Sequence, residues 1–425
     1  MIFIFPTSTS ITLRNRKRYN IVLMRQSTLL SASLAHNFRH LYGDIFWFGV
    51  LTGSTLAFLA IYAARRGATG FQVSLLTAGP ALMNLFLSLP AGRWLEGKPL
   101  IRISFWSAFW QRIGYIAIVP LAWWLHPTAE IWVIIIITLV MSAPVTFLNV
   151  GFNTLLAELV PSDWRGEVVG KRNAIFAFST TAATLLCGQI LNWIRFPDNY
   201  QIVFALGALS AGISTYHIGR LRSETKIFEI ETSQENNKKP LLRLDLLRGS
   251  FGAFMLSYLA FYTFQYLPVA IFPLYYVRVM HLSDFYISLG NALFYLTMMI
   301  ASINLGRVSA RIGHRKVLIY SALLMGFYPL CAGLARTPLL YWVASFGGGL
   351  ISGMVTGGLI NRLMERTPEN DRPAHMALYN IALNLGMLGG ALFGPLLAGI
   401  LDLRSALLVA AGLRTLAGIL LLIWA

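Results

Sequence analysis

The sequence has few cysteines and few charged residues, and both shortages narrow its class. Cys187 and Cys331 are the two cysteines of 425 residues, and each lies inside an apolar run, so the chain has no disulfide framework and no CxxC metal pair. Only 12% of the residues are charged and the mean hydropathy is +0.63. Soluble domains have about a quarter of their residues charged. Lipid is therefore the solvent for most of this chain.

Acidic residues are scarce as well, with 17 Asp and Glu against 34 Lys and Arg. The basic residues are scattered over short connectors and are not interleaved with aromatic residues in a patch, which argues against a nucleic-acid partner. All carboxylates and all seven histidines are expected at helix ends or in loops. We therefore expect no catalytic residue, no metal, no cofactor and no enzyme activity.

Apolar windows of about 19–27 residues, long enough to cross a membrane as helices, recur along the chain. Twelve begin near Ile45, Phe71, Ile103, Ile131, Asn173, Tyr200, Gly249, Phe285, Val317, Leu339, Met376 and Ser405. Most Lys and Arg fall in alternate connectors together with residues 1–43, which predicts that both termini are cytoplasmic. Residues 1–43 contain no acid and could alternatively form a transit peptide, and we expect Met24 to be the physiological start.

The chain repeats itself. Residues 158–173 read ELVPSDWRGEVVGKRN and residues 365–380 read ERTPENDRPAHMALYN, with Glu, Pro, Arg and Asn at matching positions. FQVSL (71–75) and FYISL (285–289) are each followed at the same spacing by Gly-Arg. The repeat predicts four segments: a cytoplasmic tail (1–43), an N-terminal six-helix bundle (44–219), a polar cytoplasmic linker (220–247) and a C-terminal six-helix bundle (248–425).

The stretch GRVSARIGHRK (306–316) resembles the loop motif of the major facilitator superfamily, although Ala310 replaces the motif's acid. The first copy, GRWLEGKP, keeps Glu96 but is shorter. This resemblance covers nearly the whole chain. It implies an all-α membrane protein of twelve transmembrane helices in two homologous six-helix bundles. It also implies a monomeric secondary transporter in the cell membrane, surrounded by lipid and working by alternating access.

In that family the motif resembles a latch that closes the cytoplasmic side by ion pairs. We therefore expect a cytoplasmic latch built from charged and glycine residues of the 92–98, 158–172, 306–316 and 362–372 loops; a static brace within one half is the alternative. The expected residues are Gly92, Arg93, Glu96, Glu158, Arg165, Gly306, Arg307, Arg311, Gly313, Arg315, Lys316, Glu365 and Arg372.

Polar and aromatic residues inside the predicted spans are candidates for a substrate cavity, with helix packing as the alternative. They are Asn149, Asn153, Tyr258, Tyr262, Gln265, Tyr266, Asn291, Tyr295, Asn380, Asn384 and Arg112. Arg112 and Arg414 lie within spans, and snorkelling or packing is the favoured interpretation for both. Asp44, at the expected start of the first helix, is the candidate for coupling to a proton or sodium ion, or else an exposed terminal acid.

The sequence thus predicts a secondary active transporter of a small organic solute. The alternatives are an uncoupled facilitator, an efflux pump for amphiphilic compounds, a receptor or scaffold that does not transport, and a polytopic membrane enzyme. The glycine-proline element of drug/proton antiporters is absent from the fifth helix. A similar run, GMLGGALFGPLLAG, lies in the eleventh helix, where close helix packing is its plain meaning.

Overall fold

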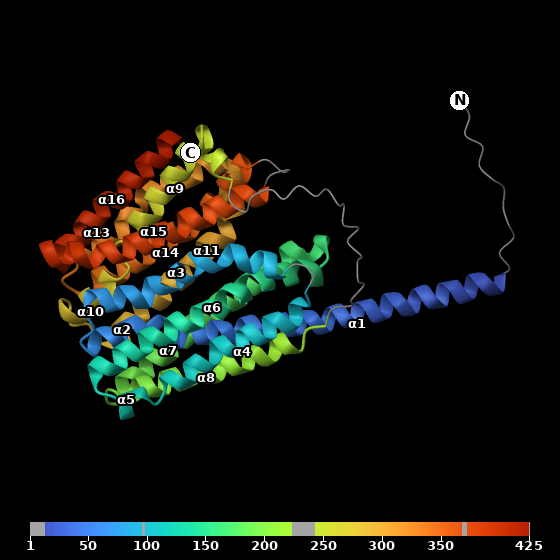
Figure 1. The fold of residues 1–425 in the computed structure, drawn as a ribbon, viewed down its shortest axis with the longest axis horizontal. Helices are drawn as coiled ribbons and strands as arrows, with labels where there is room; N and C mark the ends of the chain where they lie inside the picture. Colours follow the sequence, from blue (N-terminus) through green and yellow to red (C-terminus); the bar gives the residue numbers. More distant parts are fainter. Residues whose placement is uncertain (1–12, 96–97, 223–242, 368–371, 425) are drawn as a thin grey trace.

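The computed structural model describes residues 13–95, 98–222, 243–367 and 372–424, all in helices or short connections (Figure 1). The first half contains α1 (Leu13–Leu51), the π-helical turn η1 (Thr52–Leu56), α2 (Ala57–Arg65), α3 (Gly70–Leu95), α4 (Leu100–Ile118), α5 (Leu121–Trp124), α6 (Pro127–Leu159), α7 (Ser162–Trp193) and α8 (Asp198–Gly219). The second contains η2 (Leu244–Leu247), α9 (Ser250–Tyr266), α10 (Ile271–Arg278), α11 (Asp284–Ile312), α12 (His314–Leu323), η3 (Leu324–Gly326), α13 (Phe327–Leu334), α14 (Pro338–Arg366), α15 (Arg372–Leu401) and α16 (Leu403–Trp424).

Within the described residues, 11 helical segments are long and apolar enough to cross a membrane. The remaining predicted span corresponds to α4, a 19-residue helix that packs against α6 and α8. Arg102, Gln111 and Arg112 make α4 more polar than its neighbours. The starts of the other helices agree with the expected windows to within a few residues, except in α7, which begins at Ser162, and in the first helix.

The first span begins earlier than the sequence predicts. α1 runs without interruption from Leu13 and projects beyond the bundle, and the apolar segment extends from Ala32 to Arg65 (Figure 1). Asp44 therefore lies inside this span and is only 5% exposed. The expectation that every carboxylate lies at a helix end or in a loop was wrong, because Asp44 is compensated by buried arginines. The predicted limits of tail, bundles and linker remain predictions, and residues 223–242 lie outside the described residues.

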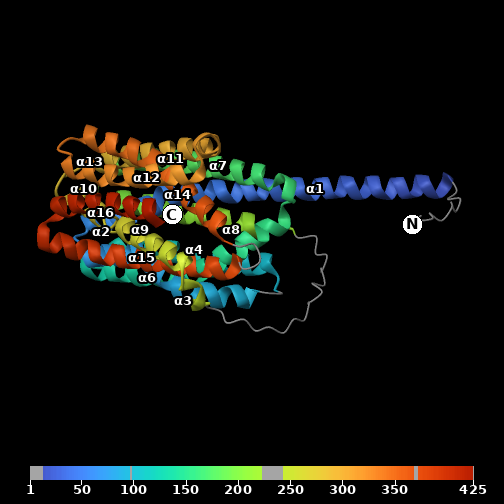
Figure 2. The same cartoon turned by 90° about the horizontal axis from the view of Figure 1, so that it is seen from above.

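The two halves meet along two helix pairs, α7 with α11 and α3 with α15. Figure 2 shows α11 alongside α7 at the upper edge of the molecule. We call the end at which α2 and α10 finish, on the left in Figure 1, the distal end, and the end at which α1 enters the proximal end. One hydrophobic core at the distal end contains residues of both halves, for example Tyr62 and Ile271. Towards the proximal end each half has hydrophobic clusters of its own.

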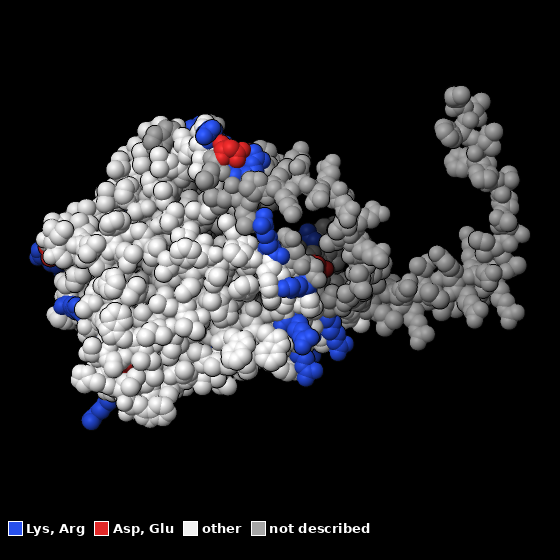
Figure 3. Space-filling view, in the orientation of Figure 1, with Lys and Arg blue, Asp and Glu red and all other residues white. Residues whose placement is uncertain are grey.

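The surface has the charge distribution expected of a membrane protein. Figure 3 shows Lys, Arg, Asp and Glu concentrated near the two ends of the visible face, with a broad uncharged belt between them. Large apolar side chains such as Ile400 and Trp124 are 82% and 76% exposed. Apolar side chains can be this exposed without a free-energy penalty when the surrounding solvent is hydrocarbon. The belt is therefore the lipid-facing surface.

Two interruptions of helical geometry lie at corresponding places in the halves. In the first half the π-helical turn η1 separates α1 from α2. In the second half residues 267–270 separate α9 from α10, because Pro268 has no N–H and its ring clashes with the preceding helical turn. Local departures of this kind in helices are frequent at functional sites.

The glycine run of the eleventh predicted helix packs closely, as the sequence predicts. Gly386, Gly390 and Gly394 lie on one face of α15, four residues apart, against the backbone of α9 and the turn that follows it. A Cβ at Gly390 would overlap the carbonyl oxygen of Thr263. The absence of side chains here lets α15 and α9 approach backbone to backbone.

Candidate functional site

A cavity of about 360 Å³ lies where α2 of the first half faces the second half. This volume is within the range of small-molecule sites. Its polar and aromatic lining consists of Gln265, Tyr266, Phe272, Tyr276, Asn291, Phe294, Tyr295, Tyr328, Ser352 and Arg414. Ala57, Ala60 and Ile61 of α2 close it from the first half. The described lining contains no Asp or Glu.

Arg414 of α16 reaches this cavity because the turn at Pro268 frees a carbonyl group. In an uninterrupted helix the Gln265 carbonyl would accept from the N–H of Val269, but that N–H donates to Tyr266 O instead, at 3.1 Å. Arg414 Nη2 donates to the freed Gln265 oxygen, and its guanidinium lies 6.0 Å from the centre of the Phe272 ring. The residue is 6% exposed.

Two buried polar atoms of the lining have no hydrogen-bond partner among the described residues. They are Arg414 Nε and Gln265 Oε1. A buried donor or acceptor without a partner costs about 1–3 kcal/mol, and more when the group is charged. Arg414 and Gln265 therefore bring an unsatisfied donor and an unsatisfied acceptor to the cavity wall.

The structure brings together four of the expected cavity residues and distributes the others elsewhere. Gln265, Tyr266, Asn291 and Tyr295 line the cavity. Tyr258 donates to Leu359 O at 2.8 Å, and the hydroxyls of Tyr262 and Tyr379 lie 2.8 Å apart, all within the core of the second half.

The described amides of α6 and α15, namely Asn149, Asn380 and Asn384, do not line the cavity. Asn384 Nδ2 donates to Asn380 O at 2.7 Å along α15, whereas Asn380 and Asn149 have exposed side chains. The Asn153 side chain lies outside the described residues. Arg414, Tyr276 and Tyr328 were not expected in the cavity. Pro268 in the middle of a span was the available signal, since it implies free carbonyl groups nearby.

The distal end is closed by polar contacts between the halves. Arg65 Nε at the end of α2 donates to Asp284 Oδ1 at the start of α11 at 2.7 Å, and Arg65 Nη2 donates to Leu282 O at the same distance. Arg278 Nη2 donates to Ala68 O at 2.6 Å. Ser74 Oγ of α3 donates to Ala391 O of α15 at 2.6 Å. With the shared hydrophobic core, these contacts join the two halves on the distal side of the cavity.

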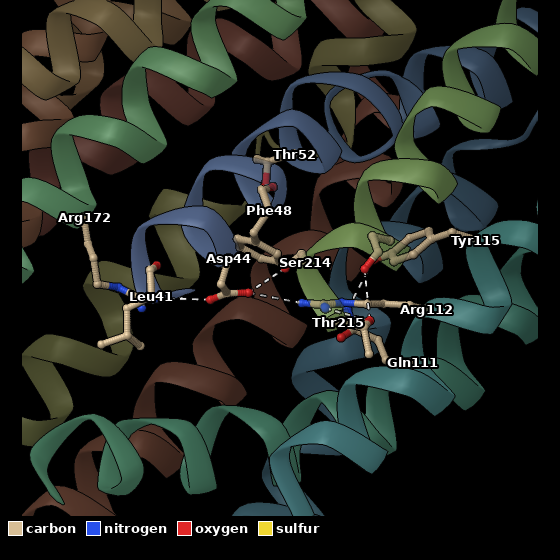
Figure 4. A network of polar contacts seen from close by, with 11 residues as sticks. Leu41, Asp44, Phe48, Thr52, Gln111, Arg112, Tyr115, Arg172, Ser214 and Thr215 are labelled. Carbon is tan, nitrogen blue, oxygen red and sulfur yellow. Dashed lines mark hydrogen bonds and ion pairs between the residues drawn. The ribbon is translucent and has the colours of Figure 1, made fainter. Parts of the chain in front are cut away.

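A second polar group, shown in Figure 4, is buried inside the first half and surrounds Asp44. Asp44 lies 3.9 Å from Arg112 Nη2 of α4 and 3.6 Å from Arg172 Nη2 of α7, and it accepts a 2.5 Å hydrogen bond from Ser214 Oγ. Arg112 also donates to Thr215 Oγ1 at 2.8 Å. Arg112 thus lies in this cluster and not in the cavity lining.

The described latch residues lie at the proximal end. Gly313, with φ of 88°, forms the bend between α11 and α12, a backbone conformation that glycine adopts readily. Arg307 donates to Asn304 Oδ1 at 3.3 Å, Arg315 to Leu422 O at 3.4 Å, and Arg165 to Val160 O at 3.1 Å.

Most of the remaining described latch residues are either paired within one helix or exposed. Glu365 pairs with Arg362 at 2.8 Å. Exposed latch residues include Arg93, Glu158, Gly306, Arg311 and Lys316, whereas Gly92 is partly buried. The side chains of Glu96 and Arg372 lie outside the described residues. Pairing of this set across the halves therefore stays a prediction.

No group of three or more His, Cys, Asp or Glu able to hold a metal ion occurs in the described part of the chain. The cavity lining, with its amides, phenols and one guanidinium, is a donor set for an organic molecule and not for a cation. A bundle of membrane-length helices around such a cavity is the architecture expected of a polytopic membrane transport protein.

Comparisons with known proteins agree. The family model described as Major Facilitator Superfamily matches residues 251–425. The multi-drug resistance efflux pump PmrA homolog of Lactococcus lactis subsp. lactis (strain IL1403) is 22% identical over 372 residues, covering 85% of this chain and 88% of the relative. The D-xylose-proton symporter structure has a TM-score of 0.70 at 14% identity, covering 91% of this chain and 96% of that one. A structure of the nucleoside transporter NupG has a TM-score of 0.69 at 12% sequence identity. The match covers 91% of this chain and 99% of that one.

Residues 251–425 thus match the major facilitator superfamily, and the chain as a whole has the fold of solved multi-pass membrane transporters. The resemblance carried by GRVSARIGHRK and by the repeated halves is thereby confirmed, as is the all-helical fold class.

Proposed function

We propose that the protein is a secondary active transporter that moves a small organic solute through the cavity between α2 and the second half by alternating access. The observation that carries this proposal is the cavity itself, with Arg414 Nε and Gln265 Oε1 buried and unpartnered beside aromatic walls. The distal contacts centred on Arg65 and Asp284 support one closed side of the cycle. The expected cavity residues that line it, such as Asn291, are proposed to contact the solute.

The proposal includes an orientation. The basic connectors and the tail favour a cytoplasmic location for both termini, in the cell membrane. The distal end then faces outward, and a molecule closed there is accessible from the cytoplasm. The latch residues at the proximal end are proposed to pair when the cavity opens to the other side.

Asp44 is proposed as the coupling residue. It is a buried carboxylate that faces Arg112, Arg172 and Ser214. The rings of His40 and His217 lie nearby, with their Nδ1 atoms 2.9 Å apart. A buried ionisable group within a membrane span is by default a candidate for a proton or ion pathway. Flux driven by a proton gradient or by a sodium gradient, each applied alone to liposomes, distinguishes the two ions.

Efflux of amphiphilic compounds is the second candidate. The relative from Lactococcus lactis bears the name of a multi-drug resistance efflux pump, and Tyr266, Phe272, Phe294 and Tyr328 would suit apolar ring systems. Vesicles that accumulate a fluorescent amphiphile against its gradient would support this candidate over uptake of a polar solute.

The first test is thermal stability of the purified protein with sugars, nucleosides, amino acids, organic anions and amphiphilic drugs at two pH values, followed by flux in liposomes. A ligand at a hundred times its Kd stabilises by about 2.7 kcal/mol. Tyr295→Ala, in the cavity, should remove that stabilisation, whereas Tyr320→Ala, 56% exposed on α12, should leave it. Folded protein that neither binds nor moves any compound would contradict the proposal and favour a receptor or scaffold.

A further inference from the structure

The charge balance of the cavity is unusual for a buried site. Arg414 is buried in the lining, and no Asp or Glu is among the described lining residues. Its identified partners are the Gln265 carbonyl oxygen and the face of Phe272, neither of which carries a full negative charge. A buried charge without a partner of opposite sign is costly, and a cation near the middle of a span costs about 3 kcal/mol or more.

Other charged groups of the described interior are compensated from within the protein. Asp44 faces Arg112 and Arg172, and Glu130 pairs with Arg66 at 2.6 Å. Arg414 differs from these arginines in that its unpartnered Nε belongs to the cavity lining. The missing negative charge is therefore expected from the molecule that fills the cavity.

The other lining side chains indicate the shape and polarity of the rest of that molecule. Phe272 and Phe294 supply apolar ring surface, and Tyr266, Tyr276, Tyr295 and Tyr328 supply rings with polar hydroxyls. The hydroxyls of Tyr276 and Tyr328 share one hydrogen bond of 2.8 Å, so this pair presents mainly ring surface to the cavity. Stacked and edge-on ring contacts contribute about 0.5–1.5 kcal/mol each beyond simple burial.

We propose, on the basis of the function proposed above, that the cavity selects an aromatic organic anion, with its carboxylate or equivalent acidic group on Arg414 and its ring between the aromatic walls. Arginine presents planar donors that match a carboxylate, and charge-assisted hydrogen bonds of this kind are the strong ones. Gln265 Oε1 accepts from a hydroxyl or amide N–H of the same ligand. An aromatic cation is disfavoured because Arg414 repels it and the described lining offers no carboxylate.

The test uses three probes of one shape that differ in charge: 2-naphthoate, 2-naphthamide and 2-naphthylmethylammonium. Binding to the full-length protein is measured by calorimetry, and flux is measured in liposomes, both at pH 7. We expect 2-naphthoate to bind about tenfold or more tightly than 2-naphthamide, since a hydrogen bond to a charged group replaces a neutral one. The ammonium probe should bind weakest.

Three variants locate the effect. Arg414→Gln should bring the two affinities to within about twofold, and Arg414→Lys should keep part of the preference because it keeps the charge. Arg404→Gln, on the same helix, is the control: Arg404 donates to Gly333 O at 2.9 Å outside the cavity, so the preference should persist. If Arg414→Gln does not fold, the Lys variant and the comparison of probes on the unaltered protein still decide the question.

The outcomes separate this inference from the proposed function. Equal affinity for naphthoate and naphthamide, absence of naphthoate binding, or a preference that survives Arg414→Gln would overturn the anion assignment. Flux of the amide or ammonium probe in that case would leave the transporter proposal standing. Absence of flux for all three probes and for every ligand that binds would overturn the proposed function.

Discussion

At the scale of single residues, Asp44 is the carboxylate that compensates two buried arginines. Asp44→Asn would leave Arg112 and Arg172 without their counter-charge in the interior of the first half. Removing one partner of a buried ion pair costs about 3–5 kcal/mol. We expect a clear decrease in the apparent melting temperature of the purified protein, measured by intrinsic fluorescence.

The matched control is Asp245→Asn. Asp245 also pairs with an arginine, Arg243 at 2.6 Å, but its side chain is 58% exposed and water screens the pair. This variant should melt at the temperature of the unaltered protein. Equal melting temperatures for both variants would show that the Asp44 cluster contributes little to stability.

Part of this chemistry could be predicted from residue types alone. Gln265, Asn291 and Tyr295 were expected in a cavity because polar groups in a span need a partner or water, and the structure places them in the lining. Arg414 was expected to snorkel or to pack, and not to line a cavity. Arg414 reaches the cavity through a hydrogen bond to the Gln265 carbonyl oxygen, which the turn at Pro268 leaves free. This contact joins distant segments of the chain, and hydropathy does not predict it.

At the scale of helices, the α9–α15 contact depends on glycine. Gly390→Ala would place a Cβ against the Thr263 carbonyl oxygen in the backbone of α9, which cannot move as a side chain can. Overpacking of this kind costs about 1–3 kcal/mol. We expect a lower apparent melting temperature together with reduced binding at the cavity, since α9 carries Gln265 and Tyr266.

Gly389→Ala is the neighbouring control. No heavy atom lies within 4 Å of a Cβ built at Gly389, so the substitution meets open space and replaces glycine by a better helix former. Stability should be unchanged or slightly raised. A comparable loss in the two variants would mean that glycine flexibility, and not close approach, matters in α15.

The sequence predicted helix positions well and helix interruptions poorly. Long apolar windows bounded by charge gave the starts of α3, α9 and α16 to within a few residues. The π-helical turn η1 was missed because TGSTL has no proline and fits a regular helix by composition. The first span was begun too late because Asp44 was treated as a boundary, although arginines from α4 and α7 make it an interior residue.

At the scale of the whole molecule, the Arg65–Asp284 pair joins the halves at the distal end. Asp284→Asn would weaken that ion pair, which is mostly buried, and favour opening at this end. A loss of about 1 kcal/mol corresponds to about a fivefold change in the population of the open form. Labelling of Ser352→Cys in a cysteine-free background, with a reagent applied from the distal side, should accelerate accordingly.

Glu130→Gln provides the control for this experiment. Glu130 pairs with Arg66 near the same end, but both residues belong to the first half, so the pair does not hold the halves together. Labelling of Ser352→Cys should then match the unaltered protein. Acceleration by Glu130→Gln alone would indicate that the distal closure depends on the packing of the first half and not on the cross-half pair.

The proposed latch makes a prediction in the opposite direction. Replacing Glu158 and Glu365 by Gln together should favour cytoplasmic access, because the outward-open form would lose proximal ion pairs. Ser352→Cys should then react faster with a reagent applied from the proximal side and more slowly from the distal side. Unchanged labelling from both sides would refute the latch.

The repeat of 158–173 and 365–380 predicted two related halves, and the fold agrees with known transporters of that design. Which end is closed could not be predicted. Closure depends on pairs such as Ser74 with Ala391, which join residues from different halves and carry no local signal in either segment.

The guanidinium of Arg414 also has an electrical consequence. Without an acidic neighbour in the described lining, the empty cavity carries one positive charge. Moving one such charge across the whole membrane changes its free energy by about 2.3 kcal/mol per 100 mV of membrane voltage. An anionic solute would cancel the charge, so voltage would bias the return of the empty carrier and leave the loaded step nearly neutral. In the proposed orientation, a cell that is negative inside would hold the empty carrier facing the cytoplasm, ready to load there.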